Sequence, residues 1–298
     1  MVVKHIDIFA TVYIENIARE LERIIISCKI NTSINIRMLN NQDINLCSLD
    51  PSRYLFLLCP QWVYNNTLVP LPNEKYFIYQ LEQFDKSESP HVFNPFVFHL
   101  MQHANHIFDY SNVNLKYYGR NKIQIPISKT SKLIPPIVSI PYDNISTGKD
   151  IDVLFCGCMS ERRRNIIQAL INSGINVTIM NNIFGIHLSN LIKRAKIFLN
   201  IRYTDSMILE TCRLHEAIKS NDTYIISELP GSSLDSTKIY NGRIHFVNII
   251  GSDNTEIIKL TRIILDLSNK GINCKNIFND IEISTDIKNS LLKIFNIK

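Results

Sequence analysis

The second half of the chain alternates short apolar runs with segments of helical periodicity, and this alternation constrains the fold more than any other feature. The run IDVLFCG (151–157) is continuously apolar, which is typical of a strand buried on both faces of a parallel sheet. A helical segment follows, with Ser160 as a candidate N-cap and Gly174 at its end. Further strands are predicted at 176–180, 196–203, 223–227 and 243–249, with helices at 187–195, around 210–216 and at about 255–269. Strands and helices in this order, with short connections, predict a doubly wound α/β domain.

The first half of the chain shows the same alternation less regularly. Strands are predicted at 5–10, 34–39, 54–60, 75–80 and 106–111, with helices at 14–27 and near 93–105. Residues 133–148 carry three prolines and no periodicity, so they are the predicted linker. We therefore expect two Rossmann-like doubly wound domains, 1–140 and 141–298, that face each other across a cleft, with a last helix able to pack back on the first domain. The carboxyl ends of the strands are the usual ligand site in such folds.

Composition and charge exclude several classes of function. The chain has 298 residues, enough for two domains, and a net charge of +5 that is too small and scattered for a nucleic-acid groove. No run approaches the ~18 apolar residues of a membrane span, and the N-terminus lacks the apolar region of a signal peptide. Seven irregularly spaced cysteines indicate reduced thiols, as in the cytoplasm.

The loop after the first strand of the second half, CGCMSERRRN, is a candidate anion site. Its single glycine, Gly157, matches neither a dinucleotide fingerprint nor a phosphate loop. A helix N-terminus flanked by arginines nevertheless favours negative charge, and a guanidinium matches the geometry of phosphate oxygens. We expect Arg162 or Arg163, rather than Arg164, to face the strand end. The alternative is a basic first turn of helix exposed to solvent.

The segment LETCRLHEAIK (209–219) carries an unusual density of charge for a helix that packs on a sheet. Glu210, Arg213 and Glu216 are spaced i, i+3, i+6, which places them on one side of the helix. A carboxylate there can accept two hydrogen bonds from a ribose diol, while an arginine holds a diphosphate. The alternative is a surface ion pair worth less than ~1 kcal/mol. His215 points away from this side, and we expect it to be partly exposed.

The order of these segments resembles that of a known family. LFCG with an Arg-rich helix start, AKIFLNI, R-x-x-E-A and IISE follow one another as in the nucleotide-sugar-binding domain of GT-B-fold glycosyltransferases of the group-one-like family. The resemblance covers roughly residues 150–250. It is weaker over residues 76–83 and 107–114, which look like the acceptor-side domain of that family.

The resemblance implies roles for individual residues. Glu216 would bind the donor ribose, and Arg213 would lie near the diphosphate or brace that carboxylate. Gly157 would allow close approach of the donor, and Glu228 would lie at the cleft end of its strand. Ile208 stands where the family has the first glutamate of its E-x7-E pattern. How the transferred sugar is held therefore stays open, with Glu210 as one candidate for that role.

Polar residues after the strands of the first half are candidates for the acceptor side. They are Gln61, Trp62, Gln80, Glu82, Asp109 and Ser111. An inverting transferase needs a general base within reach of the acceptor hydroxyl. Glu82 is the first candidate for this catalytic role and Asp109 the second, while a retaining enzyme could need neither. The alternative for Glu82 is a helix cap or an ion pair within its own domain.

Three histidines raise the question of a metal. His99, His103 and His106 are spaced i, i+4, i+7, which places them on one face if the predicted helix is continuous. No glutamate accompanies them as in H-E-x-x-H, and the family in question generally needs no metal for its chemistry. We expect no metal and no cofactor apart from the donor substrate.

Together these observations predict a glycosyltransferase that moves a sugar from a nucleoside diphosphate sugar to a hydroxyl of a glycan or protein acceptor. No nucleic-acid partner is expected. Two alternatives remain open: a nucleotide-sugar epimerase of the same architecture, and a catalytically silent relative that binds a sugar or a partner protein.

Overall fold

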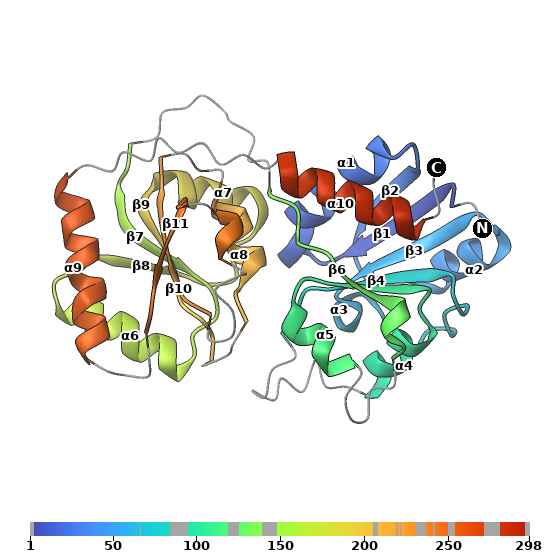
Figure 1. Cartoon of the computed structure of the whole chain (residues 1–298), viewed down its shortest axis with the longest axis horizontal. Coiled ribbons are helices and arrows are strands. Elements are labelled where there is room, and N and C mark those ends of the chain that lie inside the picture. Colours follow the sequence, from blue (N-terminus) through green and yellow to red (C-terminus); the bar gives the residue numbers. More distant parts are fainter. Residues whose placement is uncertain are drawn as a thin grey trace. The chain divides into compact units, whose positions relative to one another are not determined.

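The computed structural model shows two compact units, each built around one parallel sheet (Figure 1). Unit 1 contains residues 1–137 and 280–298, and unit 2 contains residues 138–279. The structure describes residues 3–65, 67–83, 95–118, 125–138, 148–204, 208–218, 220, 222–230, 237–240, 242–249, 254–270 and 281–295. Most of the predicted linker, residues 139–147, lies outside them. Two parallel sheets with helices on their faces confirm the predicted fold class of two Rossmann-like domains.

Unit 1 contains six parallel strands in the order β2-β1-β3-β4-β5-β6. The strands are β1 His5–Ala10, β2 Asn31–Ile36, β3 Arg53–Leu58, β4 Tyr76–Gln80, β5 His106–Asp109 and β6 Thr130–Lys132. The helices are α1 Glu15–Ser27, α2 Asn41–Leu49, α3 Pro60–Val63, α4 Pro95–His103, α5 Asn112–Tyr118 and α10 Ile281–Ile294. The order of the strands reverses between β1 and β3, which are hydrogen-bonded neighbours.

The two faces of the first sheet are covered by different helices. Apolar side chains of the sheet and of α2 to α5 form one core, which includes Leu55, Ile78 and Val97. On the other face, α10 packs with α1 (Figure 1). The centroid of the Phe295 ring lies 4.9 Å from that of the Phe77 ring. The last helix therefore completes the unit in which the chain begins.

Two edge elements of unit 1 differ from the sequence prediction. The predicted strand 34–39 begins earlier, at Asn31, because its backbone pairs in register with β1 from His5↔Asn31 to Ala10↔Ile36. Strand β6 was not predicted, since its three residues are polar and short edge strands have no apolar pattern.

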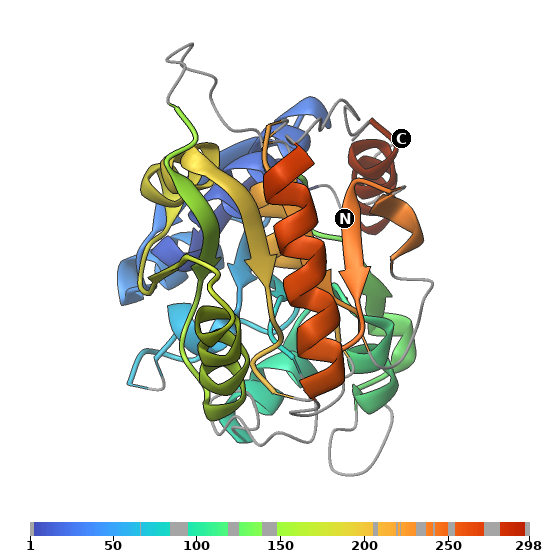
Figure 2. The same cartoon turned by 90° about the vertical axis from the view of Figure 1, so that its left-hand side faces the viewer.

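Unit 2 contains five parallel strands in the order β11-β10-β9-β7-β8. The strands are β7 Ile151–Cys156, β8 Val177–Met180, β9 Ala195–Asn200, β10 Tyr224–Glu228 and β11 Ile244–Val247. The helices are α6 Glu161–Asn172, α7 Gly185–Arg194, α8 Thr211–Ala217 and α9 Asn254–Lys270. Figure 2 shows α9 lying in front of the strands, and its Leu260 shares a core with Ile167 of α6 and with the sheet.

The strand order of unit 2 reverses between β7 and β9. Successive connections therefore leave to opposite sides at this point, and the carboxyl ends of strands at such a reversal are the usual ligand site of open α/β sheets. The side chain of Ser160 caps α6 beside it by accepting from the Arg163 amide at 3.2 Å, as predicted. Among the residues that the structure describes, no helix has both the length and the hydrophobicity of a membrane span.

Candidate functional site

The candidate site lies at the carboxyl edge of the second sheet, at the reversal between β7 and β9. Arg162, Arg163, Arg202 and Arg213 meet Glu210 and Glu228 there, and we call these six residues the arginine cluster. They come from α6, from the loop after β9, from α8 with its preceding residue, and from the end of β10. This edge is the usual ligand site of open α/β sheets.

Glu228 holds two arginines in place. Its carboxylate accepts a bidentate pair of hydrogen bonds from Arg162, one of them at 2.9 Å between Nη1 and Oε2. It also accepts from Arg202, through Nη2 at 2.7 Å and through the backbone amide at 3.0 Å. Glu228 has no exposed surface. Glu228 ends β10 and positions the arginines that surround it, and a contact of Glu228 with the donor stays a prediction.

Arg163 is buried and links three parts of the site through hydrogen bonds. Its Nε donates to the Ile201 carbonyl at 2.9 Å, its Nη1 to the Cys158 carbonyl at 2.7 Å and its Nη2 to Glu210 Oε1 at 2.7 Å. The side chain is 1% exposed, and burial lowers the pKa of Arg163 to about 10, so the guanidinium stays charged at neutral pH. Direct donor binding by Arg163 is corrected to a positioning role, because no face of the guanidinium is open to a ligand.

Glu210 connects the parts of the cluster. One oxygen accepts from Arg163 and from the Tyr203 amide, the latter at 3.2 Å, while the other accepts from Arg213 Nη1. Arg213 Nη1 also lies 3.3 Å from Asn200 Oδ1 at the end of β9. The predicted proximity of Glu210 and Arg213 is confirmed, with Glu210 at the N-cap position of α8.

Gly157 allows the close approach of Arg213 to the strand end. Its φ of +150° is a conformation that residues with a Cβ rarely adopt. A Cβ at this position would lie 2.9 Å from Arg213 Nη2 and 3.4 Å from Arg163 Nη1. The group that packs against this glycine in the structure is thus a guanidinium.

Arg162 and Arg213 are the members of the cluster that combine a guanidinium with appreciable exposed surface, 13% and 23% of their side chains. Four arginines and two glutamates give the cluster a formal charge of +2. The N-terminus of α6 adds its partial positive charge. The cluster can therefore bind an anion, and Arg164 stays outside it as an exposed residue, as predicted.

Two further residues of α8 were singled out in the sequence. Glu216 is largely buried, with 7% of its surface exposed, and its role as a ribose ligand stays a prediction. His215 was expected to be partly exposed, which is wrong. Its ring is fully buried and its Nε2 lies 3.1 Å from the hydroxyl of Tyr240, because α8 turns this side toward the interior of unit 2.

The two candidate bases in unit 1 differ in their exposure to solvent. Asp109 is fully buried, and its carboxylate accepts from Tyr118, from Asn114 Nδ2 at 3.1 Å and from the Ser111 amide at 2.8 Å. Burial raises the pKa of Asp109 well above its usual range. A base must reach the acceptor hydroxyl, so we no longer propose Asp109. Glu82 lies just past β4, is partly exposed and stays the candidate base.

Other polar residues at this edge of unit 1 are less open than expected. The side-chain amides of Gln61 and Gln80 are buried and have no hydrogen-bond partner in the described structure, so neither offers a surface to an acceptor. Trp62 is exposed at 37%.

Sequence reasoning missed Arg202 and Tyr203. Both fall within the strand predicted at 196–203, but β9 ends at Asn200 and the next residues form a loop at the site. The one available signal was Arg202 itself, a charge at the end of an otherwise apolar run.

The histidine pattern does not form one helical face. His99 and His103 lie on α4 with ring centroids 4.5 Å apart, whereas His106 begins β5 and its Nε2 lies 2.8 Å from Ser131 Oγ. Within the described ranges, no three His, Cys, Asp or Glu side chains gather so that they could hold a metal ion.

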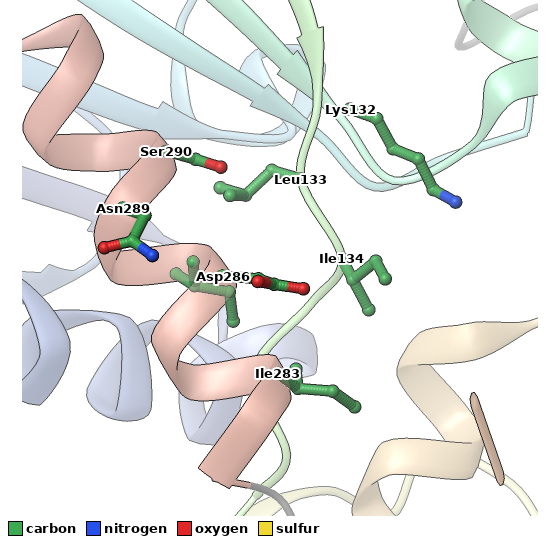
Figure 3. Close-up of a pocket in the computed structure, with 8 residues that line it drawn as sticks. Lys132, Leu133, Ile134, Ile283, Asp286, Asn289 and Ser290 are labelled. Atoms are coloured by element: carbon green, nitrogen blue, oxygen red, sulfur yellow. The ribbon is translucent and has the colours of Figure 1, made fainter.

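Unit 1 also contains a pocket of about 310 Å³ between α10 and the segment after β6 (Figure 3). It is lined by Lys132, Leu133, Ile134, Ile283, Asp286, Ile287, Asn289 and Ser290. None of these residues belongs to the arginine cluster or to the predicted acceptor side. We therefore place no step of the chemistry in this pocket.

Comparison with known proteins identifies the architecture. No protein-family model matches the sequence, and a search of curated proteins finds no match. Among solved structures, the chain is similar to MnaA of S. aureus in a co-structure with UDP, at 12% identity and a TM-score of 0.51, covering 99% of this chain and 98% of that one. At this identity the likeness concerns the fold alone, which is that of GT-B proteins with two Rossmann-like domains.

Two other similar structures span nearly the same length. One is UDP-GlcNAc 2-epimerase from Neisseria meningitidis bound to UDP-GlcNAc, at 12% identity and a TM-score of 0.49, covering 98% of this chain and 100% of that one. The other is UGT89C1 of Arabidopsis thaliana complexed with UDP, at 10% identity and a TM-score of 0.45, covering 98% and 99%.

Proposed function

We propose that the protein is a glycosyltransferase that takes a sugar from a nucleoside diphosphate sugar and transfers it to a hydroxyl of a glycan or protein. The observation that carries this proposal is the arginine cluster, which places two partly exposed arginine side chains at the strand-order reversal of unit 2. A site with a formal charge of +2 beside a helix N-terminus suits a diphosphate.

In this proposal the donor lies along the edge of the second sheet. Arg213 and Arg162 bind the diphosphate, since their side chains keep 23% and 13% of their surface exposed. Glu216, three residues after Arg213 on α8, accepts hydrogen bonds from the ribose hydroxyls. The backbone at Gly157 leaves room for the Arg213 guanidinium, because no Cβ occupies the space beside it.

Catalysis follows from fixed charge at the leaving group. When the bond from the sugar to the diphosphate breaks, negative charge grows on the diphosphate, and arginines already held in position stabilise it without reorganisation. Glu210 and Glu228 supply that fixation, because each accepts hydrogen bonds from two arginines. If the reaction inverts the sugar, Glu82 is the proposed base for the acceptor hydroxyl.

A thermal-shift screen with UDP, GDP and TDP tests the donor site. At least one nucleotide should raise the melting temperature of the full-length protein, since a ligand that binds only the folded state stabilises it. Arg213→Ala should reduce this shift, while Arg164→Ala, a loss of the same charge from an exposed residue of α6, should preserve it. If the folded wild-type protein responds to no nucleotide, the donor-site assignment is wrong.

Product analysis with a panel of nucleotide sugars then separates the classes of activity. Transfer to an added acceptor, or slow hydrolysis of the donor, supports a transferase. A nucleotide sugar with inverted stereochemistry in its sugar would indicate an epimerase instead. Binding without turnover would indicate a catalytically silent relative.

A further inference from the structure

An exposed aromatic residue lies directly beside the arginine cluster. Tyr203 follows β9 in the loop at the strand-order reversal and is 49% exposed, unlike the buried Phe155 at the end of β7. An exposed aromatic side chain next to a cluster of charged residues at the carboxyl end of a strand is a surface that a ligand bound there can contact.

Tyr203 contacts the arginine cluster through its ring and through its backbone amide. Its ring centroid lies 5.2 Å from the Arg163 guanidinium carbon, which in turn lies 5.4 Å from the centroid of the Phe155 ring. Its backbone amide donates to Glu210 Oε1 at 3.2 Å, on the carboxylate that also binds Arg213. The exposed ring and the diphosphate-binding guanidinium are thus positioned by the same glutamate.

The order of residues along α8 indicates which part of a donor would meet this ring. Glu216, Arg213 and the N-cap Glu210 follow one another at three-residue steps, about 4.5 Å apart along the helix axis. If Glu216 binds the ribose and Arg213 the diphosphate, the next group of the donor continues toward Glu210 and Tyr203. That group is the sugar to be transferred.

The chemistry of this end of the site favours the ring over the carboxylate as the sugar-binding surface. Both oxygens of Glu210 already accept hydrogen bonds, from Arg163, Arg213 and the Tyr203 amide. A pyranose presents C–H groups on its faces, and these pack against the electron-rich face of an aromatic ring. We propose that Tyr203 packs against the transferred sugar and thereby makes the site select nucleotide sugars over free nucleotides, an inference that rests on the proposed function.

Calorimetric titration of matched ligand pairs tests this role. The pairs are UDP and UDP-glucose, GDP and GDP-glucose, and TDP and TDP-glucose, each titrated into wild type, Tyr203→Ala and Tyr203→Phe. For a pair that the wild type binds, Tyr203→Ala should weaken the glucose conjugate about three- to tenfold and leave the free nucleotide within about twofold. Tyr203→Phe should behave as wild type, because it keeps the ring.

The outcomes separate this inference from the proposed function. If the wild type binds no member of any pair, the donor site itself is wrong and the role of Tyr203 is rejected with it. If nucleotides bind but Tyr203→Ala changes neither ligand, or weakens both equally, the ring only covers Arg163 and the inference alone is overturned. If Tyr203→Phe weakened binding of the glucose conjugate as much as Tyr203→Ala does, the inference would also be overturned, because the hydroxyl and not the ring would then matter.

Discussion

At the scale of single residues, the candidate site depends on two carboxylates, Glu210 and Glu228, that are largely buried and bind arginines. Glu210 and Glu228 each bind two guanidiniums, and Glu228 has no exposed surface. Buried ion pairs are costly to desolvate, so such an arrangement contributes little net stability. Its effect is to fix the positions of Arg162 and Arg213, the two arginines of the cluster whose side chains are most exposed.

Gly157→Ala should weaken nucleotide binding and destabilise unit 2. The new Cβ would lie 2.9 Å from Arg213 Nη2, so the guanidinium has to move, and the φ of +150° is strained for alanine by about 1–3 kcal/mol. Gly174→Ala is the matched control, because Gly174 also has a positive φ, +86°, but nothing lies within 4 Å of the added Cβ. Urea denaturation and nucleotide titration measure the two effects. Equal nucleotide affinity in both variants would contradict the role of Gly157.

Glu228→Ala should mainly lower stability, whereas Glu216→Ala should mainly lower nucleotide affinity. Removing Glu228 leaves Arg162 and Arg202 without their shared partner, so the free energy of unfolding should fall by about 3–5 kcal/mol. Glu216→Ala should reduce nucleotide affinity more than Glu228→Ala does, when both are measured on folded protein. Unchanged affinity in Glu216→Ala would reject the ribose contact.

The sequence predicts the members of the site better than their roles. Gly157, Arg162, Glu210 and Arg213 were selected from motif and spacing, and the structure brings them together. The burial of Arg163 and Glu228 could not be predicted, because it depends on neighbours from other strands and helices that lie far away in the sequence.

At the scale of elements, regular and buried segments were predictable and polar edges were not. The predicted strand 5–10 coincides with β1, and the predicted helix 14–27 differs from α1 by one residue. Strand β6, by contrast, consists of three polar residues that pair with β5. Its strand conformation arises from that pairing, which leaves no trace in apolar periodicity.

The burial of His106 at the start of β5 predicts that the stability of the protein depends on pH. Burial lowers the pKa of His106 from its ordinary value of 6.5 to about 4. The unfolded chain therefore takes up a proton at higher pH than the folded chain, and the contribution to stability is lost as the pH falls from about 6.5 to about 4. The loss should reach roughly 3 kcal/mol.

Urea denaturation of wild type and His106→Gln over this pH range measures the effect. In His106→Gln the free energy of unfolding should depend much less on pH than in the wild type. His99→Gln, at an exposed position on α4, should keep the wild-type dependence. If the free energy of unfolding of His106→Gln changed with pH as much as that of the wild type, other groups would account for the pH dependence.

At the scale of the whole molecule, the alternation of strands and helices was sufficient to predict two Rossmann-like domains. The last helix was expected to be able to pack back on the first domain, but the alternation alone does not determine that it lies in unit 1. Helix α10 lies in that unit, where Ile287, Leu291 and Phe295 are buried. An amphipathic pattern shows that a helix buries one face, but it does not say against which sheet.

Leu291→Ala should destabilise unit 1 selectively. Leu291 is fully buried, and a cavity of this kind costs about 2–5 kcal/mol. Hydrogen exchange followed peptide by peptide should rise in α1 and in the first sheet, while peptides of unit 2 stay protected. Lys293→Ala, at an exposed position of the same helix, is the control. Equal loss of protection in both units would show that they do not unfold separately.

The membership of α10 in unit 1 also affects the order in which the protein folds during synthesis. Because the ribosome makes the chain from its N-terminus, all of unit 2 is translated before α10 is available. Nascent unit 1 must therefore wait with the α10 side of its sheet uncovered, including the ring of Phe77 that Phe295 later contacts. The domain that is translated first is the last to be completed.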